Sequence, residues 1–244
     1  MERPAGQDIN FVAYMTWDGV ERRLAGGAAA ILPIGAGAKE HGLHLPMNTD
    51  EVQADWLASQ IAGRHDAIIW PALRYGHYPA FTDFPGSISL SKPAFMSLTA
   101  EIVAGIAAWK PRAIFILNTG ISTLAPVDAA LASKTWGVPV VHLRIHEGTR
   151  YKAAAQALAR QAFGSHADEL ETSRMMIIAP ETINLARAER TPSGPFDGPL
   201  TRENTPSGSY GDPTLATASK GQVLIDTMLA DLDEAVDRAL QQPL

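Results

Sequence analysis

The chain has 244 residues, 46% of them hydrophobic, and a formal net charge of −6 at pH 7. This length suffices for one large domain with a buried core, and the hydrophobic share is that of a folded protein. Acidic residues outnumber basic ones, 26 to 20, and the basic ones are scattered. The composition therefore excludes the basic surface typical of nucleic-acid-binding proteins, and we expect no nucleic-acid partner.

The chain contains no cysteine, which excludes disulfides, thiolate nucleophiles and cysteine-based zinc sites. Any metal ion must therefore be bound by histidine, aspartate and glutamate. The first residues, MERPAGQDINFVAYMTWDG, lack the pattern of a secretory signal. No stretch approaches the roughly 20 apolar residues that span a bilayer. We expect a cytoplasmic protein with no membrane partner.

Short apolar runs alternate with longer amphipathic segments along the first two thirds of the chain. Runs rich in Ile, Val and Leu predict buried strands at residues 27–34, 66–73, 112–118 and 138–145. The intervening patterns predict helices at Asp50–Gly63, Pro93–Trp109, Leu124–Trp136 and Thr149–Phe163. This alternation indicates an α/β fold, a three-layer α/β/α arrangement with a mostly parallel central sheet. Such sheets bind ligands at the edge where the strands end.

The last third of the chain is less regular. An apolar run, MMIIAP, predicts a buried helix after residue 173. The segment from Arg190 to Thr214 is rich in Pro, Gly, Ser and Thr and predicts a long surface loop, a kind of segment that is usually functional or mobile. A final helix is predicted at Thr217–Leu240. Because no internal repeat is evident, we expect a single domain over residues 1–244.

The densest polar stretch follows the first predicted strand and reads GAKEHGLHLPMNTD, residues 37–50. Gly42 and Pro46 would let this loop fold back, so that His41 and Asp50 meet around a metal ion, which needs imidazole and carboxylate ligands that converge. Alternatively, Asp50 with Gln53 three residues later forms a capping box for the next helix. Both interpretations stay open on this loop alone.

Two further polar clusters lie later in the chain. HADELETS, residues 166–173, forms either an acidic helix N-terminus, which the helix dipole favours, or the mouth of a site into which His166 and Glu171 point. NTGIST, residues 118–123, follows the third predicted strand. Small polar residues there suit a ligand close to the backbone, and equally an ordinary turn with a Ser or Thr cap.

In this order, the clusters resemble the creatininase family. The family's first motif, E-x-H-G-x-H-L-P-x-x-T-D after a strand ending P-x-G, is matched by KEHGLHLPMNTD after LPIG. Its later motif, H-A-G-E-x-E-T-S, is matched by HADELETS. YGHYPAFTDFPGSISL (75–90) resembles the family's YG…FPGTISL segment, and SGSYGDPTLATASKG (207–221) resembles its GDP-x-x-A-T-x-x-x-G segment. The resemblance covers nearly the whole chain.

The resemblance implies a layered α/β/α domain, a homo-oligomer that is usually a hexamer, and metal ions at the C-terminal edge of the sheet. It also implies a hydrolase of small C–N compounds such as cyclic amides, formamides and short peptides. By position, His41 and Asp50 match metal ligands, and Glu171 matches the acidic residue of the later motif. His166 matches a histidine implicated in proton transfer.

Several positions depart from the family pattern. Lys39 stands where members with two metals have a glutamate ligand, and Gly120 stands where the family's N-G-H segment supplies a histidine. The family's P-E-H before its FPG turn is replaced by Pro79-Ala80-Phe81. A charged lysine does not bind a metal, but it can neutralise the carboxylates that a second ion would face. We therefore expect a chemistry that differs from creatinine hydrolysis.

The resulting hypothesis is a site with one divalent ion per chain, bound by His41, Asp50 and Glu171, with Zn²⁺ as the first choice and Mn²⁺ or Fe²⁺ as alternatives. The ion would polarise the scissile carbonyl and lower the pKa of water from about 15.7 towards about 7. His166 would carry the proton to the leaving nitrogen. Lys39 would bind a substrate carboxylate or the developing oxyanion. Catalysis is thus expected from His166, Lys39 and Glu171.

Other polar residues have supporting roles in this hypothesis. Residues expected to contact the small-molecule substrate are Lys39, His77, Asn118 and Thr119. Glu40 and His44 are expected to orient the ligating groups without binding the ion. His146 and Glu147 follow the fourth predicted strand, where they either reach the site or begin a helix. His65 and His142 are expected to be structural.

Three functions are compatible with this pattern. The first is a metal-dependent hydrolase of a linear or cyclic, lactam-like amide. The second is a non-catalytic protein that keeps the fold and binds a metabolite, since fold alone does not determine function. The third keeps the metal but opens a non-amide ring or acts as a lyase. Activity that needs added metal and is abolished in His166→Ala would separate the second from the others.

Overall fold

A computed structural model describes residues 10–191 and 194–241. Within them, one sheet has the strand order β2-β1-β3-β4, and every pairing is parallel. The strands are β1 (Ala29–Ile34), β2 (Ala67–Ile69), β3 (Ile114–Asn118) and β4 (Val140–Arg144). Each lies inside its predicted range, and the predicted parallel α/β architecture is confirmed. β2 is shorter than the predicted 66–73, because Pro71 has no backbone N–H to donate to a ladder.

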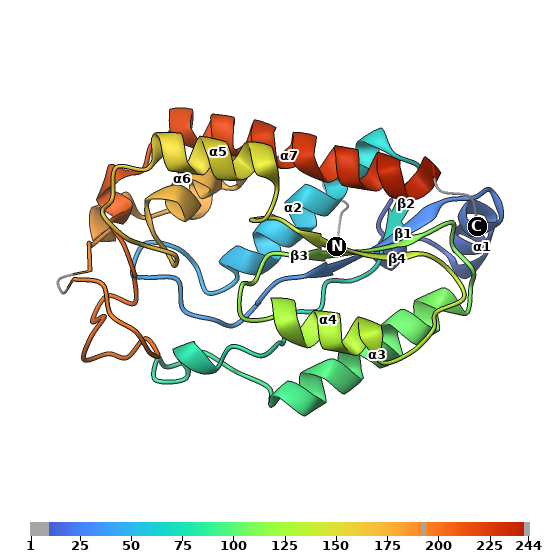
Figure 1. Cartoon of the computed structure of the whole chain (residues 1–244), viewed down its shortest axis with the longest axis horizontal. Coiled ribbons are helices and arrows are strands. Elements are labelled where there is room, and N and C mark those ends of the chain that lie inside the picture. The colour runs from blue at the N-terminus through green and yellow to red at the C-terminus, as the bar shows by residue number, and fades with distance from the viewer. Residues whose placement is uncertain (1–9, 192–193, 242–244) are drawn as a thin grey trace.

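Helices cover both faces of the sheet (Figure 1). They are α1 (Trp17–Ala25), α2 (Thr49–Arg64), α3 (Lys92–Ala107), α4 (Leu124–Ala132), α5 (Thr149–Leu158), α6 (Glu169–Ile178) and α7 (Ala218–Gln241). The predictions for α4 and α5 extended too far, to Trp136 and Phe163. The indole N–H of Trp136 instead donates to the Leu131 carbonyl at 2.8 Å, at the end of α4. α1 was not predicted.

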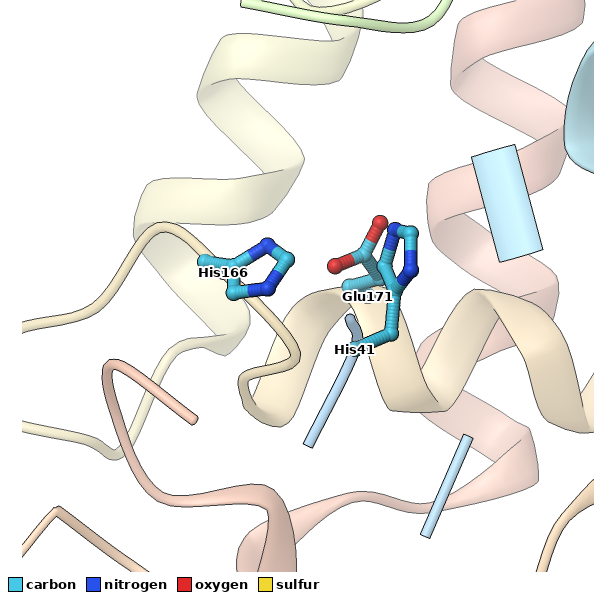
Figure 2. Close-up of side chains that lie close together, drawn as sticks. All are labelled: His41, His166 and Glu171. Carbon is cyan, nitrogen blue, oxygen red and sulfur yellow. The ribbon is translucent and has the colours of Figure 1, made fainter. Parts of the chain in front are cut away.

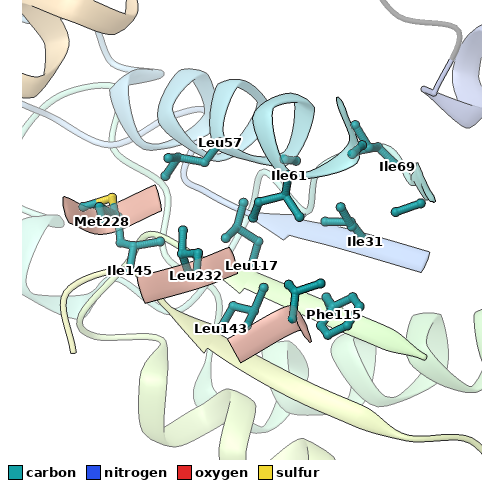
Figure 3. Close-up of a cluster of buried hydrophobic side chains, with 14 of the residues drawn as sticks. Ile31, Leu57, Ile61, Ile69, Phe115, Leu117, Leu143, Ile145, Met228 and Leu232 are labelled. Atoms are coloured by element: carbon teal, nitrogen blue, oxygen red, sulfur yellow. The ribbon is translucent and has the colours of Figure 1, made fainter. Parts of the chain in front are cut away.

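The two core layers follow from the alternation of side chains along the strands. In β1, Ile31 faces α2 and α7, whereas Leu32 faces α3 and α4; Phe115 and Ile116 of β3 divide in the same way. Figure 3 shows the first layer, where Leu57 and Ile61 of α2 and Met228 and Leu232 of α7 cover the sheet. Because β1 and β3 are buried on both faces, their sequences read as continuous apolar runs.

α6 lies against the N-terminal part of α7, away from the middle of the sheet (Figure 1). Gly221 of α7 makes this contact possible, because a Cβ at that position would collide with the Ser173 carbonyl. A partly buried ion pair between Glu169 and Lys220 also joins the two helices. These contacts position the N-terminus of α6, which carries the HADELETS residues.

The pairing register aligns the strand ends. Asn118, the last residue of β3, pairs with Ile34 of β1 and with Arg144 of β4. The segments 35–48, 119–123 and 145–148 therefore leave the sheet at one edge, the edge at which parallel sheets bind ligands. Among the helices of the described segments, none combines the length and apolar character that crossing a membrane requires.

Candidate metal centre and active site

The loop after β1 brings Asp50 to the edge of the sheet. A Cβ on Gly35 would collide with the Asp50 carbonyl, so this close approach requires glycine. Asp50 is the second residue of α2, whose N-cap is Asn48, and no side-chain cap is formed. The capping-box interpretation of Asp50 and Gln53 is therefore wrong, and the Asp50 carboxylate is available for other contacts.

Lys39 forms a buried ion pair with Asp50. Its Nζ lies 2.7 Å from Asp50 Oδ2, and both side chains are less than a tenth exposed. The ammonium also lies 4.7 Å from the ring centre of Phe81 and 5.5 Å from that of Tyr78. Burial raises the pKa of Asp50, but Lys39 and His41 outweigh burial and hold this pKa well below its usual range. An internal cation thus neutralises Asp50.

His41 also contacts Asp50, and its tautomer poses a problem that a cation would solve. Its Nδ1 lies 2.9 Å from the Lys39 carbonyl, which accepts only, so Nδ1 carries the proton. Its Nε2 faces Asp50 Oδ1 at 3.1 Å. In neutral His41 the lone pair of Nε2 would therefore oppose a carboxylate oxygen. A second proton or a shared metal ion removes this conflict.

His41, His166 and Glu171 form a group whose candidate ligand atoms all lie within 4.8 Å of one another. Figure 2 shows the three side chains converging, with His166 and Glu171 directed toward each other. The predicted ligand set shares His41 and Glu171 with this group, but contained Asp50 where the group contains His166. The loop after β1 supplies His41, whereas His166 and Glu171 come from the start of α6 and the residues before it, and all three are buried.

Hydrogen bonds hold His166 and Glu171 in place. His166 Nε2 lies 2.8 Å from Glu40 Oε1, so Nε2 donates and Nδ1 carries the lone pair. Glu171 Oε1 accepts from Gln53 Nε2 at 3.1 Å, and Oε2 accepts from the Ala167 amide at 2.8 Å. Burial raises the pKa of Glu171, but nearby His41 is the main influence that lowers it, and the net shift is downward.

The predicted orienting residues lie against this group. Besides contacting His166, Glu40 accepts a hydrogen bond from the Gly42 amide at 2.9 Å. His44 Nε2 lies 2.8 Å from Thr172 Oγ1, which joins the first motif to α6. Burial lowers the pKa of His44 to about 4, so this imidazole is neutral at physiological pH.

A cavity of about 520 Å³ opens over these residues. Lys39, Asp50, His166 and Glu171 line it, and His41 lies behind them. Aromatic side chains, among them Phe81, cover part of the wall. The cavity can therefore admit a small molecule to the carboxylates and imidazoles at its floor.

Of the other residues predicted to contact substrate, Thr119 lines the cavity, whereas the described lining residues include neither Asn118 nor His77. Asn118 Oδ1 instead accepts from the Gly120 amide and Thr123 Oγ1, and its amide group contacts His142. His77 Nδ1 donates to the Leu90 carbonyl at 2.9 Å. Both therefore organise loops.

The remaining histidines are distributed as follows. His146 lines the cavity, and its neighbour Glu147 forms an ion pair with Arg144. His65 contacts Asp233, and His142 contacts Asp128, which agrees with their expected structural roles.

Sequence reasoning missed Arg174 and Tyr151, which both line the cavity. An available signal was Arg174 itself, a basic residue directly before the apolar run MMIIAP. Burying a charged side chain beside an apolar run costs free energy unless other groups pair with the charge. Tyr151 had no distinguishing signal.

The fold and the site together define an α/β protein with a candidate metal centre at the C-terminal edge of a parallel sheet. The sequence model of the creatininase family, described as creatinine amidohydrolase, matches residues 13–236. The chain therefore belongs to the creatininase family.

Curated relatives have several names. The chain is 25% identical to the creatinine amidohydrolase of Pseudomonas putida, over 93% of this chain and 95% of that protein. It is 24% identical to the 3-dehydro-scyllo-inosose hydrolase of Thermotoga maritima, over 97% and 84%. It is 28% identical to a mycofactocin precursor peptide peptidase of Mycobacterium tuberculosis, over 87% and 86%.

Solved creatininase structures share the fold. A crystal structure of creatinine amidohydrolase superposes with a TM-score of 0.81 at 24% identity, covering 96% of this chain and 99% of that chain. A structure of creatininase with Mn superposes with a TM-score of 0.80 at 24% identity, covering 96% and 99%. A mutant described as Zn-Zn type superposes with a TM-score of 0.81 at 24% identity, covering 97% and 100%.

Proposed function

We propose that this protein is a metal-dependent hydrolase that cleaves a C–N bond of a small amide or lactam-like ring. The observation that carries the proposal is the convergence of His41, His166 and Glu171 beneath a cavity that Lys39 and Asp50 also line. Family membership supports it, because the relatives are named as hydrolases of creatinine, an inosose and a precursor peptide.

The residues present fit one divalent ion. Three buried carboxylates, those of Glu40, Asp50 and Glu171, face two buried basic side chains, Lys39 and Arg174. With His41 and His166 in the neutral form that metal binding requires, negative charge is in excess, and buried charge is costly unless it is compensated. We propose that His41, Asp50 and Glu171 hold the ion. The acceptor–acceptor contact of His41 with Asp50 favours a cation there.

The chain's own residues then supply binding and proton transfer. When bound, the ion contributes Lewis-acid polarisation of the scissile carbonyl and a lowered pKa of water. His166, held at Nε2 by Glu40, exchanges a proton through Nδ1 and delivers it to the leaving nitrogen. The Lys39 ammonium stabilises negative charge that develops on the substrate oxygen, and Phe81 excludes water from one side.

Lys39 also explains why we propose one ion rather than two. Its Nζ forms an ion pair with Asp50 Oδ2, and Gly120 has no side chain that could bind a metal at the end of β3.

A further proposal concerns assembly: the protein forms a homo-oligomer, a hexamer as in the family resemblance, in the cytoplasm. Two large apolar side chains, Trp17 and Trp109, are 80% and 67% exposed in the single chain. Light scattering after gel filtration would measure the number of chains in the assembly.

The decisive experiment combines metal analysis with product identification. Purified protein should contain, or bind after chelation, one equivalent of Zn²⁺, Mn²⁺ or Fe²⁺, and only the loaded protein should hydrolyse a panel of amides and lactams. His166→Gln should keep the metal and lose activity, whereas Glu171→Gln should lose both. Failure to bind any ion would overturn the proposal. Loss of metal in His166→Gln would assign His166 as a ligand.

A second candidate reaction is the hydrolytic opening of a ring that contains no amide. The Thermotoga maritima relative, named as an inosose hydrolase and aligned over 97% of this chain, favours including cyclic ketones in the panel. Identification of the products distinguishes the reactions, because hydrolysis of an amide or lactam generates a free amino group whereas ketone ring opening does not.

A further inference from the structure

Arg174 is a buried cation, and the described residues place no acceptor within hydrogen-bonding distance of one edge of its guanidinium. Its side chain is only 4% exposed. Nε donates to Gln53 Oε1 at 3.2 Å, and Nη1 donates to the Tyr151 hydroxyl at 2.6 Å. Both acceptors are uncharged. The guanidinium is therefore fixed in position without being neutralised by them.

The third nitrogen, Nη2, has one carboxylate within 4.0 Å among the described residues. This is Glu171, whose Oε1 lies 3.9 Å away, beyond hydrogen-bonding distance. The same oxygen already accepts from Gln53. Buried charges in proteins are normally paired and hydrogen-bonded, so this edge of the guanidinium is the one that can donate to an acceptor in the cavity.

Arg174 belongs to the wall of the same cavity as the metal group. His146, Tyr151 and Lys152 line the wall beside it. His146 Nε2 faces the Thr119 carbonyl at 3.3 Å and donates to it. Burial lowers the pKa of His146 to about 4, so this imidazole is neutral and does not compete for an anion. Lys152, which is exposed, adds positive charge at the rim.

We propose that Arg174 forms a carboxylate-binding subsite next to the reaction centre, so that the substrate is a small amide or lactam that also carries a carboxylate. This inference rests on the proposed hydrolase function and specifies its substrate class. Planar guanidinium groups match carboxylates with paired hydrogen bonds. Arg174 follows Glu171 by three residues on α6, a spacing at which side chains are neighbours. The carboxylate therefore lies only a few bonds from the scissile C–N bond.

A matched pair of lactams tests this subsite. L-pyroglutamate and its neutral carboxamide have the same ring and nearly the same size, and differ in charge. Isothermal titration of both compounds with the metal-loaded protein should show at least tenfold tighter binding of pyroglutamate, the order expected for a charge-assisted hydrogen bond. Equal affinity for the two compounds in the wild type would overturn the proposal without any variant.

Variants then locate the source of the preference. Arg174→Gln should bring the two affinities within about twofold, and Arg174→Lys, which keeps the charge in a smaller side chain, should retain part of the preference. Arg150→Gln is the matched control, because Arg150 is an exposed arginine that pairs with Asp231 and Glu234. A preference that persists in folded Arg174→Gln would show that the metal or Lys39 binds the carboxylate, and would contradict the subsite.

The same measurements separate this inference from the hydrolase proposal. Hydrolysis of neutral amides without an Arg174-dependent preference would keep the hydrolase and remove the subsite. An Arg174-dependent preference in a protein that binds no metal would keep the subsite and remove the hydrolase proposal. Thermal unfolding of each variant shows whether it is folded at the titration temperature, and Arg174→Lys serves if Arg174→Gln is not.

Discussion

Two sets of buried polar groups share the floor of the cavity, and they differ in how their charge is neutralised. Lys39 and Asp50 form an ion pair within the chain, 2.7 Å apart. His41, His166 and Glu171 converge without a basic Lys or Arg side chain at hydrogen-bonding distance among the described residues: Glu171 accepts from neutral groups, and the two imidazoles contact Asp50 and Glu40. The first set carries its own cation, whereas the second set has the composition of a site that recruits one. Asp50 joins the two sets, because Lys39 pairs with its Oδ2 whereas its Oδ1 faces His41.

The largest effect should come from removing the internal cation. Lys39→Met leaves the Asp50 carboxylate buried without its ammonium partner, which typically costs about 3–5 kcal/mol of unfolding free energy. Urea denaturation of the metal-free protein measures this loss. The double variant Lys39→Met/Asp50→Asn should recover most of it, because no uncompensated charge remains. A loss of less than about 1 kcal/mol in Lys39→Met would mean that the pair contributes little.

A slightly smaller effect is expected from acid, through His44, which joins the first motif to α6. The pKa of His44 is lowered to about 4 by burial, against about 6.5 in an unfolded chain. The unfolded state therefore binds the proton first. Stability is complete above pH 6.5 and falls as the pH drops towards 4, by about 3 kcal/mol in total.

Urea denaturation of chelator-treated protein at a series of pH values tests this dependence. His44→Gln, which preserves a hydrogen-bonding group near Thr172, should flatten the slope between pH 6.5 and 4. His65→Gln is the control, because His65 contacts the carboxylates of Asp233 and Asp237 near the surface. An unchanged slope in His44→Gln would contradict the assignment.

Substitutions of His41, His166 or Glu171 should change metal affinity more than they change the free energy of unfolding. Glu171→Gln removes a charged candidate ligand while keeping its shape, and we expect metal binding to weaken at least about 100-fold, since even residues that only orient ligands contribute 10- to 100-fold. Competition with a chromophoric chelator measures the affinity. Glu147→Gln, which changes a carboxylate paired with Arg144, should leave it unchanged. Equal affinities in the two variants would exclude Glu171 as a ligand.

The smallest of these effects concerns the turn after β3. Asn118→Ala removes the acceptor of the Gly120 amide and of Thr123 Oγ1, which should cost about 1–2 kcal/mol of stability. Because Asn118 does not line the cavity, metal affinity should remain within about threefold. Thermal unfolding and the same chelator competition give both values. A large loss of metal affinity with no loss of stability would instead show that Asn118 contributes to the metal site.

The arrangement of strands and helices was predictable from the sequence because its signals are local. The apolar runs of β1 and β3, such as Ala29–Ile34, can be read without knowing their neighbours. Helix ends were less accurate where a tertiary contact decides them, as Trp136 does beyond α4. Family motifs identified His41, Asp50, His166 and Glu171, but not their distances from one another.

Sequence alone determined which chemical groups are available: imidazoles and carboxylates without cysteine, and a lysine at a former ligand position. Only the tertiary structure decided how they are used. In the sequence, Asp50 and Gln53 fit a helix capping box as well as a metal site. In the structure, the close approach that Gly35 permits places the Asp50 carboxylate against Lys39 instead. The role of Arg174 follows only from the tertiary structure, in which Tyr151 and Gln53 hold its guanidinium at the cavity wall. The physical reason is that charge compensation depends on distances of a few ångströms, often between residues far apart in the chain, such as Glu40 and His166, which are 126 positions apart, and local sequence does not encode these distances.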